Sequence, residues 1–288
     1  MNVVEAVITY FQNSGFSVAL SKTLLIFDYW TGTEGSVLPV ATRLTQREME
    51  KYEQIVFFVS TPREDHFDNV IYTYNFDKLP ISYVVCDDVP IGTRGKRIKQ
   101  GDTVTIGDVT VTAYASTDIG VSLYVQAEGI KIYYAGDLNY WHWREESSLR
   151  EIRAAEKAFY DALKPVEKLP VDISMFPVDP RQGGMFDAGA NYFIMAVKPR
   201  IMIPMHFQDK AEIVLDFARH GRTRYTETVA LTKPREQAIA TFDDARLSIR
   251  VVQPEEQYTT RGGRAEVKLD SLSGSNPFSD TDLPVDFE

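Results

Sequence analysis

The sequence predicts an α/β fold in four layers, in which two β-sheets pack face to face and helices cover them on both outer sides. The first half of the chain consists mainly of strand-like segments, whereas the second half alternates helix-like and strand-like segments. Such an order suits an αββα sandwich. With 288 residues, 44% of them hydrophobic, the chain is long enough to bury a large core.

The strands expected in the first half are short, rich in Val, Ile, Phe and Tyr, and separated by turn residues. They cover residues 2–11, 16–21, 22–30, 54–60 and 82–86. Two longer stretches, 100–115 and 120–137, alternate apolar and polar residues around glycine-containing turns, which is typical of hairpins. We also expect a helix directly after the strand at 54–60.

Three helices are expected in the second half, each beginning near Ser or Asp and ending near Pro or Gly. They cover residues 147–165, 187–199 and 209–221. In the first helix the apolar residues recur at helical spacing, so one face should pack on a sheet; these residues are Leu149, Ile152, Ala155, Phe159 and Leu163. Further strands are expected at 171–177, 200–206, 226–231 and 246–252.

Charge and composition exclude several classes of protein. A net charge of −10 argues against a general nucleic-acid or membrane-surface binder. No apolar run approaches the roughly 20 residues of a membrane span, and the N-terminus lacks the basic region of a signal peptide. The single cysteine, Cys86, cannot form an internal disulfide and is expected to be a small core residue. We therefore expect a cytoplasmic protein with no membrane or nucleic-acid partner; its oligomeric state is not predicted.

The composition changes near the C-terminus, where Ser, Asp, Pro and Gly dominate and few hydrophobic residues remain. We expect one domain over residues 1–260 and an acidic, disordered tail over 261–288. Residues from Asp270 onward should be dispensable for folding.

Potential metal ligands follow three of the expected strands. Asp65 and His66 follow the strand at 54–60, Asp137 ends the second hairpin, and His206 ends the strand at 200–206. A rigid scaffold brings such strand ends together, so these four side chains are expected to converge. Two imidazoles and two carboxylates suit one divalent metal ion, zinc first and manganese or iron as alternatives.

With these residues in place, the sequence resembles the metallo-β-lactamase superfamily, in its metal-dependent hydrolase branch. The resemblance covers roughly residues 1–255 and is most specific in the segments 59–69, 133–143 and 203–207. The first looks like the family's H-x-H-x-D-H loop, the second like the strand that carries its bridging aspartate, and the third like its last histidine strand. This resemblance implies the family's αββα sandwich.

The resemblance also implies that one of the family's two metal positions is lost. The two leading histidines of the loop fall at Thr61 and Arg63, and the next histidine falls at Thr117 or Asp118. The other position keeps all of its ligands. We therefore expect at most one metal ion, and a site without metal is the alternative.

Arg63 stands where a metal ligand would otherwise be. A guanidinium is always charged and can grip a carboxylate with two parallel hydrogen bonds. Arg63 could thus pair with Asp137 or Asp118, or bind an anionic group of a substrate. It could equally point to solvent and neutralise Glu64.

Two functions from different classes remain open. The first is a metal-dependent hydrolase of a small ester, lactone or phosphate, with Asp65, Asp137 and Arg63 as catalytic residues. The second is a catalytically inactive binding or regulatory module that recognises an anionic ligand. Asp179 and Arg181 could line the pocket or pair with each other, and Trp141 and Trp143 could shape a substrate slot.

Overall fold

The computed structural model describes residues 3–32, 37–74, 76–143, 146–243 and 246–254. Residues 1–254 form one compact unit, which contains both sheets and every candidate site residue. The segment 261–288 lies outside the described residues, so its expected disorder stays a prediction.

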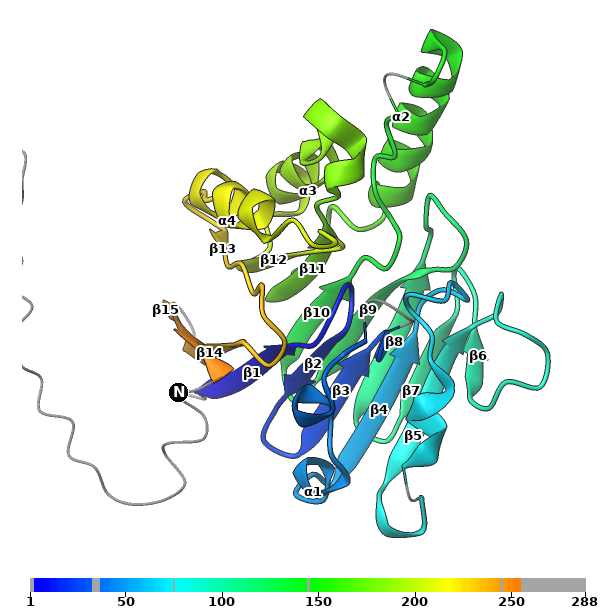
Figure 1. Cartoon of the computed structure of the whole chain (residues 1–288), viewed down its shortest axis with the longest axis vertical. Helices are drawn as coiled ribbons and strands as arrows, with labels where there is room; N and C mark the ends of the chain where they lie inside the picture. Colours follow the sequence, from blue (N-terminus) through cyan, green and yellow to red (C-terminus); the bar gives the residue numbers. More distant parts are fainter. Residues whose placement is uncertain (1–2, 33–36, 75, 144–145, 244–245, 255–288) are drawn as a thin grey trace, which may run out of the picture. The chain divides into compact units, whose positions relative to one another are not determined.

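The first sheet has eight strands in the order β15-β14-β1-β2-β3-β4-β5-β6 (Figure 1). These strands are β1 (Val4–Tyr10), β2 (Phe16–Ala19), β3 (Thr23–Phe27), β4 (Gln54–Val59), β5 (Ile81–Cys86), β6 (Lys96–Ile98), β14 (Gln237–Asp243) and β15 (Arg246–Val252). The strands from β3 to β6 run parallel, whereas β1, β2, β14 and β15 pair antiparallel with their neighbours. All of β3 and nearly all of β4 is buried, as expected of parallel strands covered on both faces.

The second sheet has seven strands in the order β13-β12-β11-β10-β9-β8-β7. They are β7 (Thr103–Ile106), β8 (Val109–Tyr114), β9 (Ser122–Ala127), β10 (Ile130–Tyr134), β11 (Ile173–Pro177), β12 (Ile201–Met205) and β13 (Glu227–Thr228). The two predicted hairpins are confirmed as β7–β8 and β9–β10. From β10 to β13 the strands run parallel, because helical segments connect them.

The helices form in sequences that carry clear start signals. They are α1 (Gln46–Met49), α2 (Leu149–Leu163), α3 (Ala188–Val197) and α4 (Ala211–His220). Ser148 and Glu151 form a reciprocal capping box at the start of α2. Phe159 and Leu163 of α2 are buried as predicted, but Leu149 is 74% exposed, so only the C-terminal part of this helix packs on the core.

The prediction of a helix after the strand at 54–60 is wrong. The structure has two short 3₁₀ segments there, η2 (Asn69–Thr73) and η3 (Phe76–Lys78). Val, Ile, Tyr and Thr, which dominate 70–74, are weak helix formers, and Asp68 caps η2 by accepting a hydrogen bond from the Val70 N–H. Two further 3₁₀ segments are η1 (Val40–Thr42) and η4 (Pro180–Met185).

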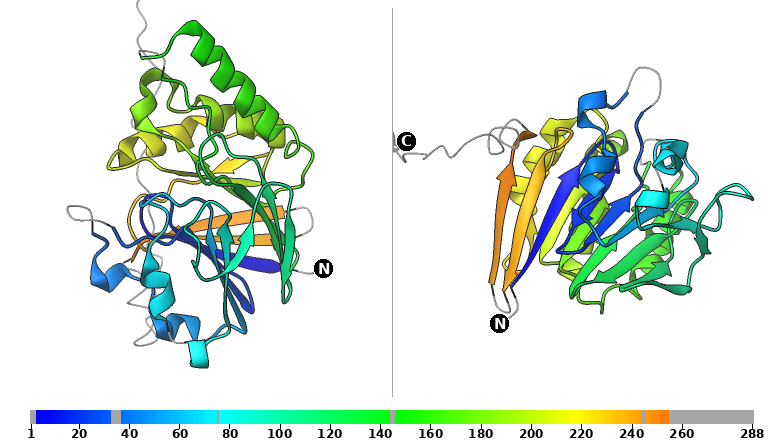
Figure 2. Two further views of the ribbon diagram at one scale, coloured as in Figure 1. Left: turned by 90° about the vertical axis from the view of Figure 1, so that its right-hand side faces the viewer. Right: turned by 90° about the horizontal axis from the view of Figure 1, so that it is seen from below.

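The predicted α/β fold with two packed sheets is confirmed. Helices α2, α3 and α4 cover the second sheet, while α1 and the 3₁₀ segments η1, η2 and η3 lie on the far side of the first sheet (Figure 2). The outer layer on the first sheet is therefore thinner than the one on the second.

Aromatic rings join the two sheets. Phe27 of β3 stacks on Phe58 of β4 and on Tyr134 of β10, with ring centroids 4.8 and 4.9 Å apart. All three rings are buried. Burying a large apolar side chain contributes about 1.5–3 kcal/mol, so this cluster helps fix the sheets against each other at the edge where β3, β4 and β10 end. In the part of the chain that the structure describes, no helix is both long and apolar enough to cross a membrane.

Candidate metal centre

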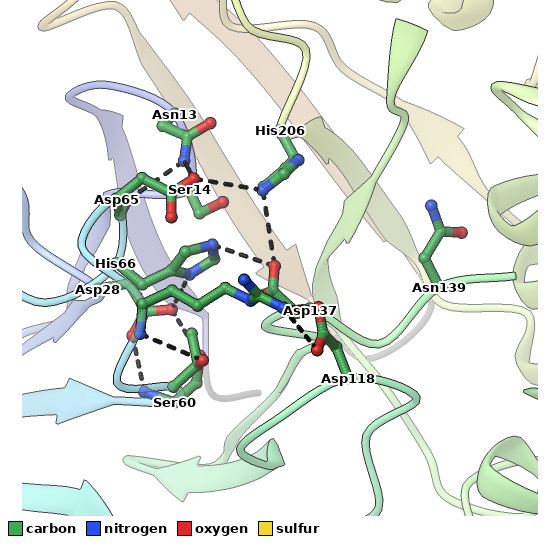
Figure 3. A network of polar contacts seen from close by, with 12 residues as sticks. Asn13, Ser14, Asp28, Ser60, Asp65, His66, Asp118, Asp137, Asn139 and His206 are labelled. Carbon is green, nitrogen blue, oxygen red and sulfur yellow. Dashed lines mark hydrogen bonds and ion pairs between the residues drawn. The ribbon is translucent and has the colours of Figure 1, made fainter. Parts of the chain in front are cut away.

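His66 lies in the turn that follows β4, and its side chain is fully buried. Its Nδ1 lies 2.6 Å from Oδ2 of Asp28, and its Nε2 lies 3.1 Å from Oδ1 of Asp137 (Figure 3). A carboxylate only accepts hydrogen bonds, so Asp28 fixes the proton on Nδ1. The lone pair of Nε2 is then left for another partner, as in histidines that bind metals.

Asp28, directly after β3, is buried and held by three further donors. The Ser60 N–H donates to Oδ1 at 2.7 Å, and the Ser60 and Tyr134 hydroxyls reach Oδ2 at 2.5 and 2.8 Å. Sequence reasoning missed Asp28. Its position at the end of a buried strand is the same signal that identified Asp65 and His206.

His206 follows β12 and is almost completely buried. Its Nδ1 lies 2.9 Å from Oδ2 of Asp179, while its Nε2 lies 3.5 Å from Oδ1 of Asp137 and 3.6 Å from Oδ2 of Asp65. Asp179 in turn accepts hydrogen bonds from the backbone N–H and the guanidinium of Arg181. Asp179 and Arg181 thus pair with each other and hold the His206 ring as well.

Asn13, in the turn between β1 and β2, joins the two ligand loops. Its amide nitrogen donates to Oδ2 of Asp65 at 3.0 Å and to the Asp65 carbonyl at 3.2 Å. Its own carbonyl accepts a hydrogen bond from the His206 N–H. Asn13 has a φ of +50°, a conformation that asparagine tolerates better than most residues. The sequence signalled only a turn here.

Three of these side chains are close enough together to hold a metal ion, and Asp137 lies beside them. Asp65, His66 and His206 offer ligand atoms that all lie within 4.8 Å of one another, and Asp137 contacts both imidazoles. Ligands at about 2.0–2.1 Å from a tetrahedral ion lie about 3.3–3.4 Å apart, close to the contacts of 3.1, 3.5 and 3.6 Å. Nε2 of His66 is buried and makes no hydrogen bond among the described residues. We call these four residues the candidate metal set.

The electrostatics of the set favour charged side chains. Burial by itself would lower the pKa of His66, but Asp137 and Asp28 raise it well above its usual value. The pKa of His206 is likewise raised, because the effects of Asp179 and Asp65 outweigh that of burial. Burial opposes ionisation of Asp65 and Asp137, yet the histidines lower the pKa of both carboxyl groups. In the metal-free site two carboxylates thus balance two imidazoliums, and a cation that binds there has to displace the imidazolium protons.

Arg63 turns toward the site rather than toward Glu64. Its Nη2 donates to both carboxylate oxygens of Asp118, at 2.7 and 2.6 Å, and its Nε lies 3.5 Å from Oδ2 of Asp137. Asp137 therefore lies between two cationic positions. Its Oδ1 faces the imidazoles and its Oδ2 faces the guanidinium.

The other positions where the resemblance places histidines hold no histidine. Thr61 is buried, and the Thr117 hydroxyl donates to the Asn139 carbonyl at 2.6 Å. Arg63 and Asp118 occupy the remaining positions.

A cavity of about 420 Å³ opens beside these groups. It is lined by Arg63, Asp65, Thr117, Asp118, Asp137, Trp141, Trp143, Arg181 and His206. Cys86, in contrast, is buried at the end of β5, where burial raises the pKa of its thiol to about 12, so it remains a core residue. His142 and His220 do not belong to the candidate metal set: the first packs edge-on against Tyr140 and the second is exposed at the end of α4.

The sequence matches no family model and no curated protein. Solved structures do share its fold. Igni18, a novel metallo hydrolase from the hyperthermophilic archaeon Ignicoccus hospitalis, gives a TM-score of 0.56 at 14% identity, over 84% of this chain and 99% of that chain. The metallo-β-lactamase fold protein YhfI from Bacillus subtilis gives 0.54 at 10% identity, also over 84% and 99%. CmlA, a diiron β-hydroxylase from Streptomyces venezuelae, gives 0.50 at 12% identity, over 81% of this chain and 53% of that chain.

The chain therefore has the metallo-β-lactamase fold, and the resemblance seen in the sequence is confirmed at the level of the fold. Structures with this fold include metal-dependent hydrolases. The reduced metal-binding motif at 61–66 stays a prediction, and so does the role of each site residue.

Proposed function

We propose that this protein is a hydrolase that uses one metal ion and one arginine. Asp65, His66, Asp137 and His206 would hold the ion. The observation that carries this proposal is that the two imidazoles direct Nε2 toward Asp137, while carboxylates hold both Nδ1 atoms from behind. Outer partners of this kind orient histidine ligands and set their tautomer.

A bound divalent cation would polarise a scissile ester, lactone or phosphate group and lower the pKa of a water molecule. The chain's own residues supply the remaining chemistry. Asp65, whose side chain is 38% exposed to the cavity, can accept a hydrogen bond from the attacking water. Asp137 can orient the same water through Oδ2, which makes no hydrogen bond among the described residues.

Arg63 supplies positive charge on the other side of Asp137. Its salt bridge to Asp118 fixes the guanidinium and raises its pKa, so it remains charged at any working pH. A fixed cation in this place can stabilise the negative charge that develops on the reacting group. It would thus take over part of the role of a second metal ion.

Zinc is the first candidate for the ion, because a mixed histidine and carboxylate set suits it, with manganese and iron as alternatives. The substrate would be a small and anionic molecule that enters the cavity of about 420 Å³. We also propose a cytoplasmic location, with neither nucleic acid nor membrane as partner.

The second candidate function is an inactive module that binds an anion. The observation that favours it is the Arg63–Asp118 pair, which occupies the place of the lost ligands. An anionic ligand could replace Asp118 as the partner of the Arg63 guanidinium. In that case the metal set would remain free of metal.

The metal content separates the two functions. We expect the parent to bind about one equivalent of zinc, the Thr61→His, Arg63→His double variant to gain metal, and His206→Gln to lose it. His220→Gln, at an exposed histidine, is the matched control and should keep the parent's content. Two tightly bound equivalents in the parent would contradict the proposed loop. If the parent bound no metal after incubation with zinc, manganese and iron, only the binding-module function would remain.

A further inference from the structure

A second cavity continues from the first. It has a volume of about 530 Å³ and is lined by Trp143, Glu146, Arg181, Gln182, Gly183, Gly184 and Met185. Trp143 and Arg181 line both cavities. A ligand that lies beside the candidate metal set can therefore extend past these two side chains into additional space.

Trp143, which lines both cavities, forms a flat aromatic platform with Trp141. The rings of Trp141 and Trp143 are parallel to within 5°, with centroids 6.0 Å apart. Trp141 is tied directly to the candidate metal set, because its Nε1 donates to the Asp137 carbonyl at 2.9 Å and its ring packs edge-on against His206. The platform therefore has a fixed position relative to the reacting group.

The second shared wall is cationic. The Arg181 guanidinium uses Nε and Nη2 to bind Asp179, which raises its pKa and holds it in place. Among the described residues its Nη1 makes no hydrogen bond, and half of the side chain is exposed. Nη1 of Arg63 also makes no hydrogen bond in this part of the chain. Two guanidinium groups with spare donors thus line the first cavity, and such forks match the oxygens of a phosphate better than those of a neutral lactone.

We propose that the substrate is a phosphate ester that also carries a flat aromatic or heteroaromatic ring. The phosphate lies between Arg63 and Arg181, and the ring stacks on Trp143 and extends toward η4. This inference rests on the proposed hydrolase function and names the substrate class of the same site.

The reaction balances without any further reagent. The oxygen of one water molecule forms a new bond to phosphorus, and the ester P–O bond breaks with its electron pair left on the alcohol oxygen. One proton of the water passes to that oxygen, and the other hydrogen stays with the new P–OH group. The products are an alcohol and a phosphate.

Binding of non-hydrolysable phosphonates tests the ring, because all of the probes share the phosphonate group. The probes are benzylphosphonate, cyclohexylmethylphosphonate and methylphosphonate, measured by calorimetry on the full chain loaded with zinc. The first two have similar size, but only benzyl is flat. Stacking beyond simple burial favours the flat ring, so we expect the parent to bind benzylphosphonate about fivefold more tightly than the cyclohexylmethyl analogue.

Variants at the platform assign this preference to Trp143. Trp143→Ala should remove the preference for benzyl, Trp143→Phe should restore most of it, and neither should change the affinity for methylphosphonate. A parent without any preference for benzyl would overturn the proposal, and so would a preference that persists in Trp143→Ala.

The proposed function and this inference can fail separately. A protein that binds one zinc ion but shows no preference for benzylphosphonate keeps the function and loses the substrate class. A protein that binds no metal but still prefers benzylphosphonate through Trp143 loses the hydrolase function and keeps the ligand class, as a binding module.

Discussion

Asp28 controls the orientation of the His66 ring through Nδ1. Replacing it by asparagine removes the negative charge behind the imidazole and offers an amide in its place. Loss of such an outer partner typically weakens metal binding about 10–100-fold, and we expect Asp28→Asn to fall in that range. Competition with a chromophoric chelator measures the affinity.

Asp87→Asn is the matched control for this prediction. Asp87 is exposed and pairs with Arg97 instead of a histidine, so its variant should bind zinc as the parent does. Because Asp28 is buried, circular dichroism must show that Asp28→Asn is folded, and Asp179→Asn provides an independent case behind His206. Unchanged zinc affinity in both folded variants would mean that these carboxylates do not tune the metal set.

Metal binding should release protons from the two histidines. Metals bind the neutral imidazole, whereas the neighbouring carboxylates raise the pKa of His66 and of His206 and so favour the protonated form in the metal-free protein. Affinity for zinc should therefore rise with pH up to the raised pKa values of the two histidines and level off above them. The carboxylates contribute no protons, because the pKa values of Asp65 and Asp137 are lowered.

Calorimetric titrations of zinc in two buffers with different ionisation enthalpies count the released protons. We expect zinc binding to release protons at pH 7, and to release fewer in His206→Gln. The exposed His220→Gln variant should leave the count unchanged. Zinc binding without any proton release would show that the imidazoles are neutral or do not bind the ion.

Gly120 lies so close to the end of β4 that a residue with a Cβ cannot replace it without a clash. Gly120, just before β9, has a φ of +103°, and a Cβ there would lie 2.2 Å from the Ser60 carbonyl oxygen and 2.9 Å from the Thr61 Cα. An alanine would push the end of β4 away and move the turn that carries Asp65 and His66. Gly120→Ala should therefore reduce both stability and zinc affinity.

Gly92→Ala separates this clash from backbone strain. Gly92 has a similar φ of +90°, but a Cβ there would meet no atom within 4 Å. Both variants carry the strain of an unfavourable φ, about 1–3 kcal/mol. We expect urea unfolding to show that Gly120→Ala is less stable than Gly92→Ala by more than about 1 kcal/mol. Equal stability would mean that β4 and β9 can separate without cost.

The strands were easier to predict from the sequence than the contacts that orient the ligands. Alternating or continuous apolar runs are local signals, and they identified β1 to β5 and both hairpins. The partnership of Asp28 with His66 joins residues 38 positions apart, and Asn13 lies 52 positions from Asp65. No local pattern encodes such pairs, because they arise only when β1 to β4 assemble into the first sheet. The pairing of Arg63 with Asp118 was foreseen as one of several options, and the structure selects it.

The candidate metal set connects the two sheets of the molecule. Asp65 and His66 follow β4 of the first sheet, whereas Asp137 follows β10 and His206 follows β12 of the second. A bound ion would therefore bridge both sheets, and unfolding would have to release it. Binding to the folded state alone stabilises a protein by about 2.7 kcal/mol when the free ligand is at 100 times its Kd.

This linkage predicts a rise in melting temperature with zinc. For a chain of this size, about 2.7 kcal/mol corresponds to a shift of roughly 5–10 °C. Zinc should raise the melting temperature of the parent and of His220→Gln by the same amount, and it should leave His206→Gln nearly unchanged. If His206→Gln gains as much as the parent in a thermal melt, zinc binds elsewhere on the chain and the two sheets are not joined by this site.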